Sequence, residues 1–245
     1  MDEVEVVVAH AERATLRVGE VFLKIDADQT RADVEIEAMA LAPVPTPEVL
    51  WRNPPVLALA LVPGEPLGRL GQPSTASAAA WAAAGAAVRR LHDAPPPPWA
   101  GPSIEGKAAS LERECAWLLD NDVLPADLVR RNRELAEGAL RPREPVFVHG
   151  DLQVAHVFMD GDEVAGVIDW SEAGRGDAMY DLATLTLGHP EHLGHVIAGY
   201  GGAVDRDVVR GWWSLRSLTA IRWLSEHGFD PFAPGCEVDV LRSQV

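Results

Sequence analysis

The chain has 245 residues, of which 47% are hydrophobic and 24% are charged, and this balance excludes an intrinsically disordered protein. The formal net charge of −16 argues against nucleic acid and anionic membranes as partners, because both are bound through clustered Lys and Arg. The charge favours a cationic small molecule as the partner, although an acidic surface that only keeps the protein soluble is the simpler explanation.

No sequence feature directs the chain to a membrane or to secretion. The first residues, M-D-E-V-E, lack the basic and apolar regions of a signal peptide, and the Ala-rich run at residues 76–88 is too short to span a bilayer. Cys115 and Cys236 lie far apart without a Cys-x-x-Cys pair, which argues against a disulfide framework and a zinc site. We expect a cytoplasmic protein, either a monomer or a homodimer.

The first part of the chain is predicted to be rich in β-structure. Short apolar or alternating runs indicate strands at residues 4–9, 14–18, 20–26, 49–51 and 56–62. In the third run Lys24 shares a face with Phe22, because side chains alternate along a strand. A lysine there can reach a nucleotide phosphate, whereas a solvated lysine is the simpler explanation of this segment alone.

One helix is predicted within this part, at residues 31–42. The apolar residues at helical spacing are Val34, Ala38 and Leu41. Glu37 lies within that apolar stripe, whereas Glu35 lies further round the helix. A carboxylate on a buried stripe requires a cation, and Lys24 is the available one. We therefore predict an ion pair between Lys24 and Glu37.

Pro63-Gly64 ends the β-rich part, and we expect an N-terminal lobe of residues 1–63 and a C-terminal lobe of residues 64–245. The connection between the lobes can hydrogen-bond a flat base through its backbone. The second lobe is expected to be mainly helical. Its predicted helices are at residues 77–92, 105–119, 126–140, 177–187, 192–200 and 205–227.

The stretch at residues 146–170 combines strands with polar residues. Two short apolar runs predict strands, and each run leads directly to polar residues. Asp151 closes the sequence H-G-D after the first run, and Asp169 follows the second run. His156 stands five residues after Asp151. Two carboxylates fixed at strand ends, with a ligand-type residue between them, indicate a metal-assisted reaction.

The order of these features resembles the protein-kinase plan, in which a strand Lys pairs with a helix Glu and two Asp residues follow in the second lobe. The blocks H-G-D-L, I-D-W and G-D-x-x-x-D-L-A resemble the aminoglycoside phosphotransferase and choline kinase-like (APH) family of small-molecule kinases. The loop is similar to that of macrolide phosphotransferases, which also place His where most of the family has Asn. The resemblance implies an α+β, protein kinase-like fold with two lobes.

The resemblance implies transfer of the γ-phosphate of ATP, or of GTP, to a hydroxyl of a small molecule. Asp151 would accept the hydroxyl proton, and His156 with Asp169 would hold Mg²⁺, or Mn²⁺ because nitrogen ligands favour it. Lys24, fixed by Glu37, would neutralise phosphate charge. The adenine pocket is assigned to Phe22, Ala60 and Val62.

Three further residues, in or just after this stretch, are assigned structural roles. His149 is expected to brace the loop, Asp177 to cap a helix and Asp181 to anchor the loop. One departure from the family lies near the start of the chain, where residues 9–14 contain no glycine to approach the phosphates closely. Nucleotide affinity is therefore expected to be reduced, unless the small alanines suffice or the nucleotide is held mainly by Lys24 and the metal.

The acceptor is the least determined part of the prediction. A polycationic aminoglycoside requires carboxylates, which Glu172, Glu226 and Asp230 can supply. A macrolide requires an aromatic wall, for which the chain offers Trp212, Trp213 and Trp223, although packing between helices is their simpler role. We assign the acceptor side to Glu172, Trp213 and Glu226. A metabolic alcohol or an amino-sugar remains an alternative acceptor.

Two other functions remain open at this point. A catalytically weak nucleotide-binding or regulatory protein is suggested by the glycine-poor turn and by His156. A metal-dependent hydrolase could use the same carboxylates. The first alternative predicts nucleotide binding without stimulated turnover, and the second predicts phosphate release that is independent of an acceptor.

Overall fold

A computed structural model describes residues 4–9, 13–101 and 103–244. Of the glycine-poor turn at residues 9–14, residues 10–12 lie outside these described residues. The N-terminal part forms a five-stranded antiparallel sheet in the order β1-β2-β3-β5-β4. The strands are β1 (Val4–Ala9), β2 (Arg13–Val18), β3 (Val21–Asp26), β4 (Val49–Asn53) and β5 (Val56–Ala60).

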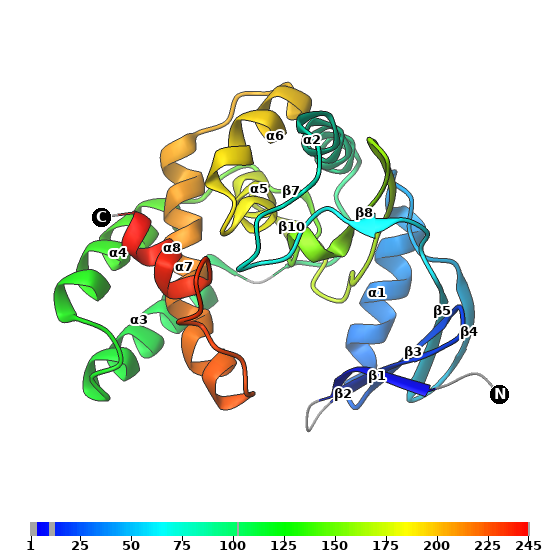
Figure 1. The fold of residues 1–245 in the computed structure, drawn as a ribbon, viewed down its shortest axis with the longest axis horizontal. Helices are drawn as coiled ribbons and strands as arrows, with labels where there is room; N and C mark the ends of the chain where they lie inside the picture. Colours follow the sequence, from blue (N-terminus) through cyan, green and yellow to red (C-terminus); the bar gives the residue numbers. More distant parts are fainter. Residues whose placement is uncertain (1–3, 10–12, 102, 245) are drawn as a thin grey trace.

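Helix α1 (Gln29–Leu41) lies between this sheet and the rest of the molecule (Figure 1). It begins after Asp28, whose side chain accepts a hydrogen bond from the backbone N–H of Thr30, as expected for an N-cap. Its buried residues are Ala32, Glu35, Ala38 and Met39. The helix therefore presents Glu35, and not Glu37, to the interior.

Two smaller sheets form the junction with the helical part. Strand β6 (Glu65–Pro66) pairs with β8 (Val157–Asp160), which pairs with β9 (Glu163–Val167). Strand β7 (Val146–Val148) pairs with β10 (Gly174–Gly176). We propose the division into lobes at residues 63 and 64, because β6 pairs with a strand from the second half of the chain and not with the N-terminal sheet.

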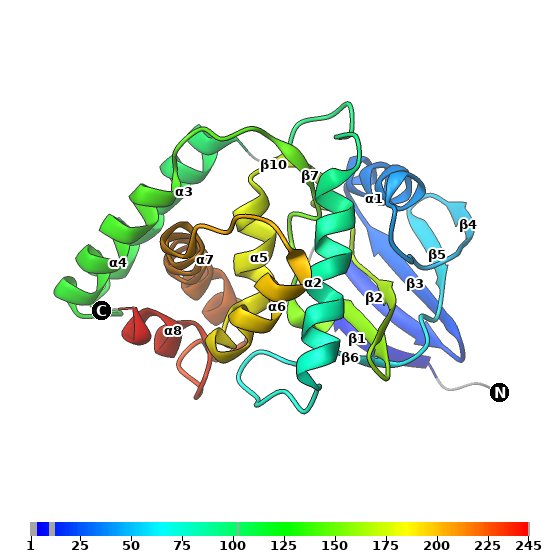
Figure 2. The same cartoon turned by 90° about the horizontal axis from the view of Figure 1, so that it is seen from above.

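The remainder is helical (Figure 2). It comprises α2 (Ala78–Asp93), α3 (Ile104–Asp120), α4 (Ala126–Ala139), α5 (Ala178–Thr186), α6 (Leu193–Tyr200), α7 (Arg206–Glu226), α8 (Glu237–Ser243) and two short 3-10 turns, Val154–His156 and Pro190–His192. Helix α7 contacts α3, α4, α5 and α8, and its buried Trp212 lies in the core with Trp81, Phe147 and Trp170. A Cβ atom at Gly199 would lie 1.8 Å from the carbonyl oxygen of Ala82, so α2 and α6 can approach this closely only with glycine there.

The α+β class predicted from the sequence is confirmed, with the β-structure first and the helices after it. The short strands β8 and β10 and helix α8 were not predicted, because they have few residues and no clear periodicity. Within the described part of the chain, no helix combines the length and the apolar character needed to cross a bilayer.

Candidate active site

The loop after β7 is held by the buried side chain of His149. Its Nε2–H donates to the carbonyl oxygen of Ile168 at 3.0 Å, and its Nδ1 accepts from the backbone N–H of Asp151 at 3.3 Å. Burial lowers the pKa of His149, which favours the neutral imidazole that these two contacts require. His149 thereby fixes the backbone of Asp151 relative to Ile168, the residue before Asp169.

The same loop is anchored by the fully buried carboxylate of Asp181. Its oxygens accept the backbone N–H groups of His149 at 2.8 Å and Gly150 at 3.0 Å, and His92 Nε2 lies 3.1 Å away. Gly150 has φ +83°, and a Cβ there would lie 2.1 Å from the carbonyl oxygen of Glu172. Only glycine fits this position, so the H-G-D sequence fixes the path of the loop.

Asp177 lies at the N-cap of α5, where its Oδ1 accepts the backbone N–H of Met179 at 2.9 Å. Its second oxygen accepts from Arg143 and from the indole N–H of Trp212, each at 3.0 Å. Asp177 therefore connects α5 to α7 and to the segment before β7.

Asp169 follows β9 and has a left-handed backbone with φ +65°. This conformation is unfavourable for a residue with a side chain, and such strain is concentrated at functional sites. Lys24 Nζ donates to Asp169 Oδ1 at 2.9 Å, and His156 Nε2 lies 3.9 Å from Asp169 Oδ2. Burial alone would raise the pKa of Asp169, but Lys24 and His156 outweigh it and lower that pKa.

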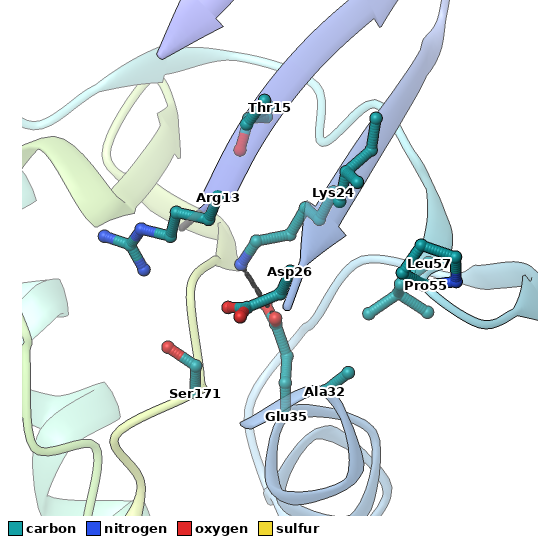
Figure 3. Close-up of a pocket in the computed structure, with 11 residues that line it drawn as sticks. Arg13, Thr15, Lys24, Asp26, Ala32, Glu35, Pro55, Leu57 and Ser171 are labelled. Carbon is teal, nitrogen blue, oxygen red and sulfur yellow. Dashed lines mark hydrogen bonds and ion pairs between the residues drawn. The ribbon is translucent and has the colours of Figure 1, made fainter. Parts of the chain in front are cut away.

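Lys24 also donates to both carboxylate oxygens of Glu35, at 2.6 and 2.7 Å (Figure 3). The ion pair predicted with Glu37 is therefore wrong in its acidic partner: Glu37 is exposed, and Glu35 is 2% exposed. Burial alone would lower the pKa of Lys24, but Asp169 and Glu35 reverse the effect and raise it. Lys24 is thus a charged side chain that joins β3 to α1 and to the loop after β9.

A pocket opens between the N-terminal sheet, α1 and the segment after Asp169 (Figure 3). Arg13 and Thr15 of β2, Lys24 of β3, Glu35 of α1 and Ser171 line it. Arg13 and Lys24 bring two positive charges to the pocket, and Asp26 and Glu35 bring two carboxylates. Arg13 was not singled out from the sequence, because nothing in its strand distinguishes it from a surface arginine.

The three residues assigned to an adenine pocket lie outside the lining of this pocket. Phe22 of β3 pairs with Leu59, and Ala60 pairs with Val21, so both lie on the central strands of the sheet. Val62 is buried, and its side chain fills the space over Gly166 of β9. Their contact with a nucleotide base stays a prediction.

His156 lies between the two aspartates. Its Nδ1–H donates to the backbone carbonyl oxygen of Asp151 at 2.8 Å, so in the neutral ring Nε2 keeps its lone pair, on the side of Asp169. Nδ1 also lies 4.0 Å from Asp151 Oδ2. His156 therefore places Nε2 beside the carboxylate of Asp169, 3.9 Å from Oδ2.

Asp151 has a cationic partner that the sequence analysis missed. Arg216 Nη2 donates to Asp151 Oδ1 at 2.5 Å, and Gln153 Nε2 donates to Oδ2 at 2.9 Å. Burial would raise the pKa of Asp151, but the guanidinium of Arg216 outweighs burial and lowers it. The available signal was a lone arginine among small and apolar residues of α7, in W-W-S-L-R-S-L.

The family described as "Phosphotransferase enzyme family" (APH) matches residues 10–216. The chain belongs to this family. It has the kinase-like α+β fold of the family: an N-terminal antiparallel sheet followed by a helical part.

Three relatives are similar to this phosphotransferase. The viomycin phosphotransferase of Streptomyces vinaceus is 30% identical over 189 residues, and the match covers 69% of this chain and 63% of that protein. An aminoglycoside phosphotransferase of Streptomyces rimosus, solved with ADP and streptomycin, is 28% identical with a TM-score of 0.65, covering 88% and 92% of the two chains. A choline/ethanolamine kinase family protein of Mesorhizobium loti, 21% identical with a TM-score of 0.68 and coverage of 99% and 85%, shows the same fold.

The residues assigned to the acceptor side of this phosphotransferase are not brought together. Trp213 is 5% exposed and donates its indole N–H to the carbonyl oxygen of Ala183 at 2.8 Å, so it belongs to the core and its assignment is corrected. Glu226 is paired with Arg222 on the surface, about 15 Å along α7 from Arg216. Glu172 lies near the site and is paired with Arg31 at 2.6 Å.

Proposed function

We propose that this phosphotransferase transfers the γ-phosphate of ATP, or of GTP, to a hydroxyl of a small molecule, and that an aminoglycoside-type or macrolide-type antibiotic is the acceptor. The observation that carries the proposal is the convergence of Lys24, Asp169, His156 and Asp151 from segments far apart in the chain. The similarity to phosphotransferases named for viomycin and solved with streptomycin supports an antibiotic acceptor.

Asp151 is the proposed base for the acceptor hydroxyl. Its carboxylate is ionised, since its pKa is lowered, and the contacts from Gln153 and Arg216 hold it in one orientation. The hydroxyl oxygen attacks the γ-phosphorus in line with the departing ADP, and its proton passes to Asp151. Most of the rate acceleration therefore comes from positioning of the reactants and from electrostatic stabilisation of the transition state.

Lys24 and Arg13 are proposed to neutralise phosphate charge, because both cations line the pocket between β2, β3 and α1. Glu35 holds Lys24 through two short contacts, so the ammonium is positioned before a nucleotide arrives. Phe22, Ala60 and Val62 remain the proposed contacts of the base.

His156 and Asp169 are the proposed ligands of the Mg²⁺ or Mn²⁺ that phosphoryl transfer requires. Nε2 of His156 and Oδ2 of Asp169 lie 3.9 Å apart, so both atoms could bind one ion that would also bind phosphate. Across residues 4–9, 13–101 and 103–244, no group of three or more His, Cys, Asp and Glu side chains forms a complete metal site. The ion would neutralise phosphate charge, and the nitrogen of His156 gives Mn²⁺ an advantage that an oxygen ligand would not.

The acceptor class is supported more weakly than the transfer itself. The formal charge of −16 favours a cationic acceptor in general, which suits aminoglycosides. A small metabolic alcohol or amino-sugar is the alternative, because the fold is shared with a choline/ethanolamine kinase family protein. We keep the prediction of a cytoplasmic location, since the proposed reaction consumes ATP.

The test is acceptor-dependent release of ADP or GDP. ATP and GTP are each incubated with Mg²⁺ or Mn²⁺ and with a panel of viomycin, streptomycin, other aminoglycosides, macrolides and small amino alcohols. We expect at least one acceptor to stimulate nucleoside diphosphate release, and Asp151→Asn to abolish that stimulation while it still binds nucleotide. Nucleotide binding without stimulation would favour a regulatory protein, and acceptor-independent phosphate release would favour a hydrolase.

A further inference from the structure

The two carboxylate oxygens of Asp151 have different surroundings. Oδ1 receives Arg216 Nη2 at 2.5 Å and Gln153 Nε2 at 3.2 Å. Oδ2 receives Gln153 Nε2 at 2.9 Å and lies 4.0 Å from His156 Nδ1. Oδ1 therefore faces α7, and Oδ2 faces the side on which His156 and Asp169 lie.

The number of hydrogen bonds differs between the two oxygens as well. An ionised carboxylate oxygen accepts about two hydrogen bonds. Oδ1 has two donors, of which Arg216 is charged and therefore strong. Oδ2 has one donor, and Nδ1 of His156 is directed to the backbone carbonyl oxygen of Asp151. Oδ2 thus keeps an acceptor position for an incoming hydroxyl.

Arg216 is itself held in place by its neighbours. Its Nη1 donates to the hydroxyl oxygen of Tyr180 at 3.4 Å. The ring of Tyr180 is packed edge-on against Trp212 at 5.1 Å, and the ammonium of Lys107 lies 3.8 Å from its centroid. A planar guanidinium can contact Asp151 and Tyr180 at once, which a lysine ammonium cannot match in geometry. The guanidinium is therefore oriented by Tyr180 of α5 as well as by Asp151.

From this geometry we infer that Arg216 is the positioning residue of the catalytic loop: it holds Oδ1 of Asp151 so that Oδ2 is the oxygen that receives the acceptor proton. The inference rests on the proposed function. In the balanced step, the hydroxyl proton moves to Oδ2 as the hydroxyl oxygen bonds to the γ-phosphorus, and the bond from that phosphorus to the bridging oxygen of ADP breaks. Arg216 acts through Asp151 and contacts neither phosphate nor proton.

The first test is a double-mutant cycle with the acceptor identified in the panel. Arg216→Ala is expected to lower kcat on the order of 10²-fold and to leave the KM for ATP nearly unchanged, because misplacement of a reacting group costs about that factor. In an Asp151→Asn background the same substitution should have no further effect, since the group it positions is gone. Arg222→Ala is the matched control, because Arg222 lies on the same helix and pairs with Glu226 at the surface.

Two rescue experiments separate positioning from a general structural role. Arg216→Lys should recover part of the lost kcat, because lysine restores the positive charge but not the planar arrangement of several N–H donors. Guanidinium chloride, at concentrations too low to unfold the protein, should raise the kcat of Arg216→Ala but not that of Arg222→Ala. An unchanged kcat in Arg216→Ala, or an equally large loss in the Asp151→Asn background, would overturn the inference.

A crystal structure of Arg216→Ala provides a readout that does not need an acceptor. We expect the Asp151 side chain to leave the orientation in which Oδ2 faces His156. An unchanged Asp151 carboxylate, held by Gln153 alone, would contradict the positioning role. Failure of the proposed function is a separate result, because it appears as a wild-type protein that no acceptor stimulates.

Discussion

Asp169 and Asp151 are each paired with one cation from outside the loop, but the two cations come from opposite ends of the chain. Asp169 meets Lys24, which lies 145 residues earlier on the N-terminal sheet, and Asp151 meets Arg216, which lies 65 residues later on α7. Lys24 also binds Glu35 and lines the pocket that we assign to the nucleotide. Arg216 also contacts the partly buried Tyr180 of α5 in the helical part.

This difference divides the site into two halves with separate supports. On the Asp169 side, Lys24, Glu35 and Asp169 join the sheet, α1 and the loop. A substitution of any of these three residues should therefore disturb nucleotide and metal binding together. On the Asp151 side, the loop is fixed by Asp181 of α5, which accepts the backbone N–H groups of His149 and Gly150. A loss at Asp151 should therefore affect the chemical step and leave nucleotide binding intact.

The two aspartates give the largest expected effects and test this division directly. Asp151→Asn should lower kcat by about 10²–10⁴-fold, the usual contribution of a general base, with the Kd for nucleotide nearly unchanged. Asp169→Asn should lower turnover at least as much and should also weaken nucleotide binding in the presence of Mg²⁺ or Mn²⁺. Acceptor-stimulated ADP release and fluorescent-nucleotide titration measure the two quantities. Equal losses of nucleotide affinity in both variants would contradict the division of the site into an Asp169 half and an Asp151 half.

The two glutamates of α1 form a matched pair for the next prediction. Glu35→Gln removes the charge that holds Lys24, and we expect kcat/KM for ATP to fall on the order of 10-fold to 10²-fold, as positioned electrostatic contacts are worth. Glu37→Gln should change kcat/KM little, because that side chain is exposed. Steady-state kinetics with ATP as the varied substrate measures both. If kcat/KM for ATP fell equally in both variants, the result would support Glu37 as the partner of Lys24, as predicted from the sequence.

The difference between Glu35 and Glu37 shows where prediction from sequence stops. The sequence predicted a glutamate partner for Lys24, but which face of α1 is buried depends on how the helix packs on the sheet. Leu41, which set the predicted phase, is 50% exposed, whereas Met39 is buried. By contrast, the H-G-D loop was predictable from its motif residues, because Gly150 has φ +83° and the side chain of Asp181 accepts the backbone N–H of Gly150. Arg216 could not be predicted, since its contact with Asp151 arises only from the packing of α7.

His156 offers a smaller effect within the Asp169 half of the site. His156→Asn replaces a ring nitrogen by an amide oxygen, so we expect the ratio of activity with Mg²⁺ to activity with Mn²⁺ to rise, by about 10-fold or less. Titration of each metal against initial rate at saturating ATP measures this ratio. A ratio that stays constant while kcat falls would mean that His156 supports the loop and does not bind the metal.

Trp213 gives the smallest expected effect on activity and sharpens the contrast along α7. It lies three residues before Arg216, but its indole N–H donates to the carbonyl oxygen of Ala183 within the core. Trp213→Phe removes that hydrogen bond and part of a buried ring, so the free energy of unfolding should fall by about 1–3 kcal/mol, as measured by chemical denaturation. The kcat and the acceptor KM should stay nearly constant at a temperature where the variant is folded. A selective rise in the acceptor KM would instead place Trp213 on the acceptor side, which its burial argues against.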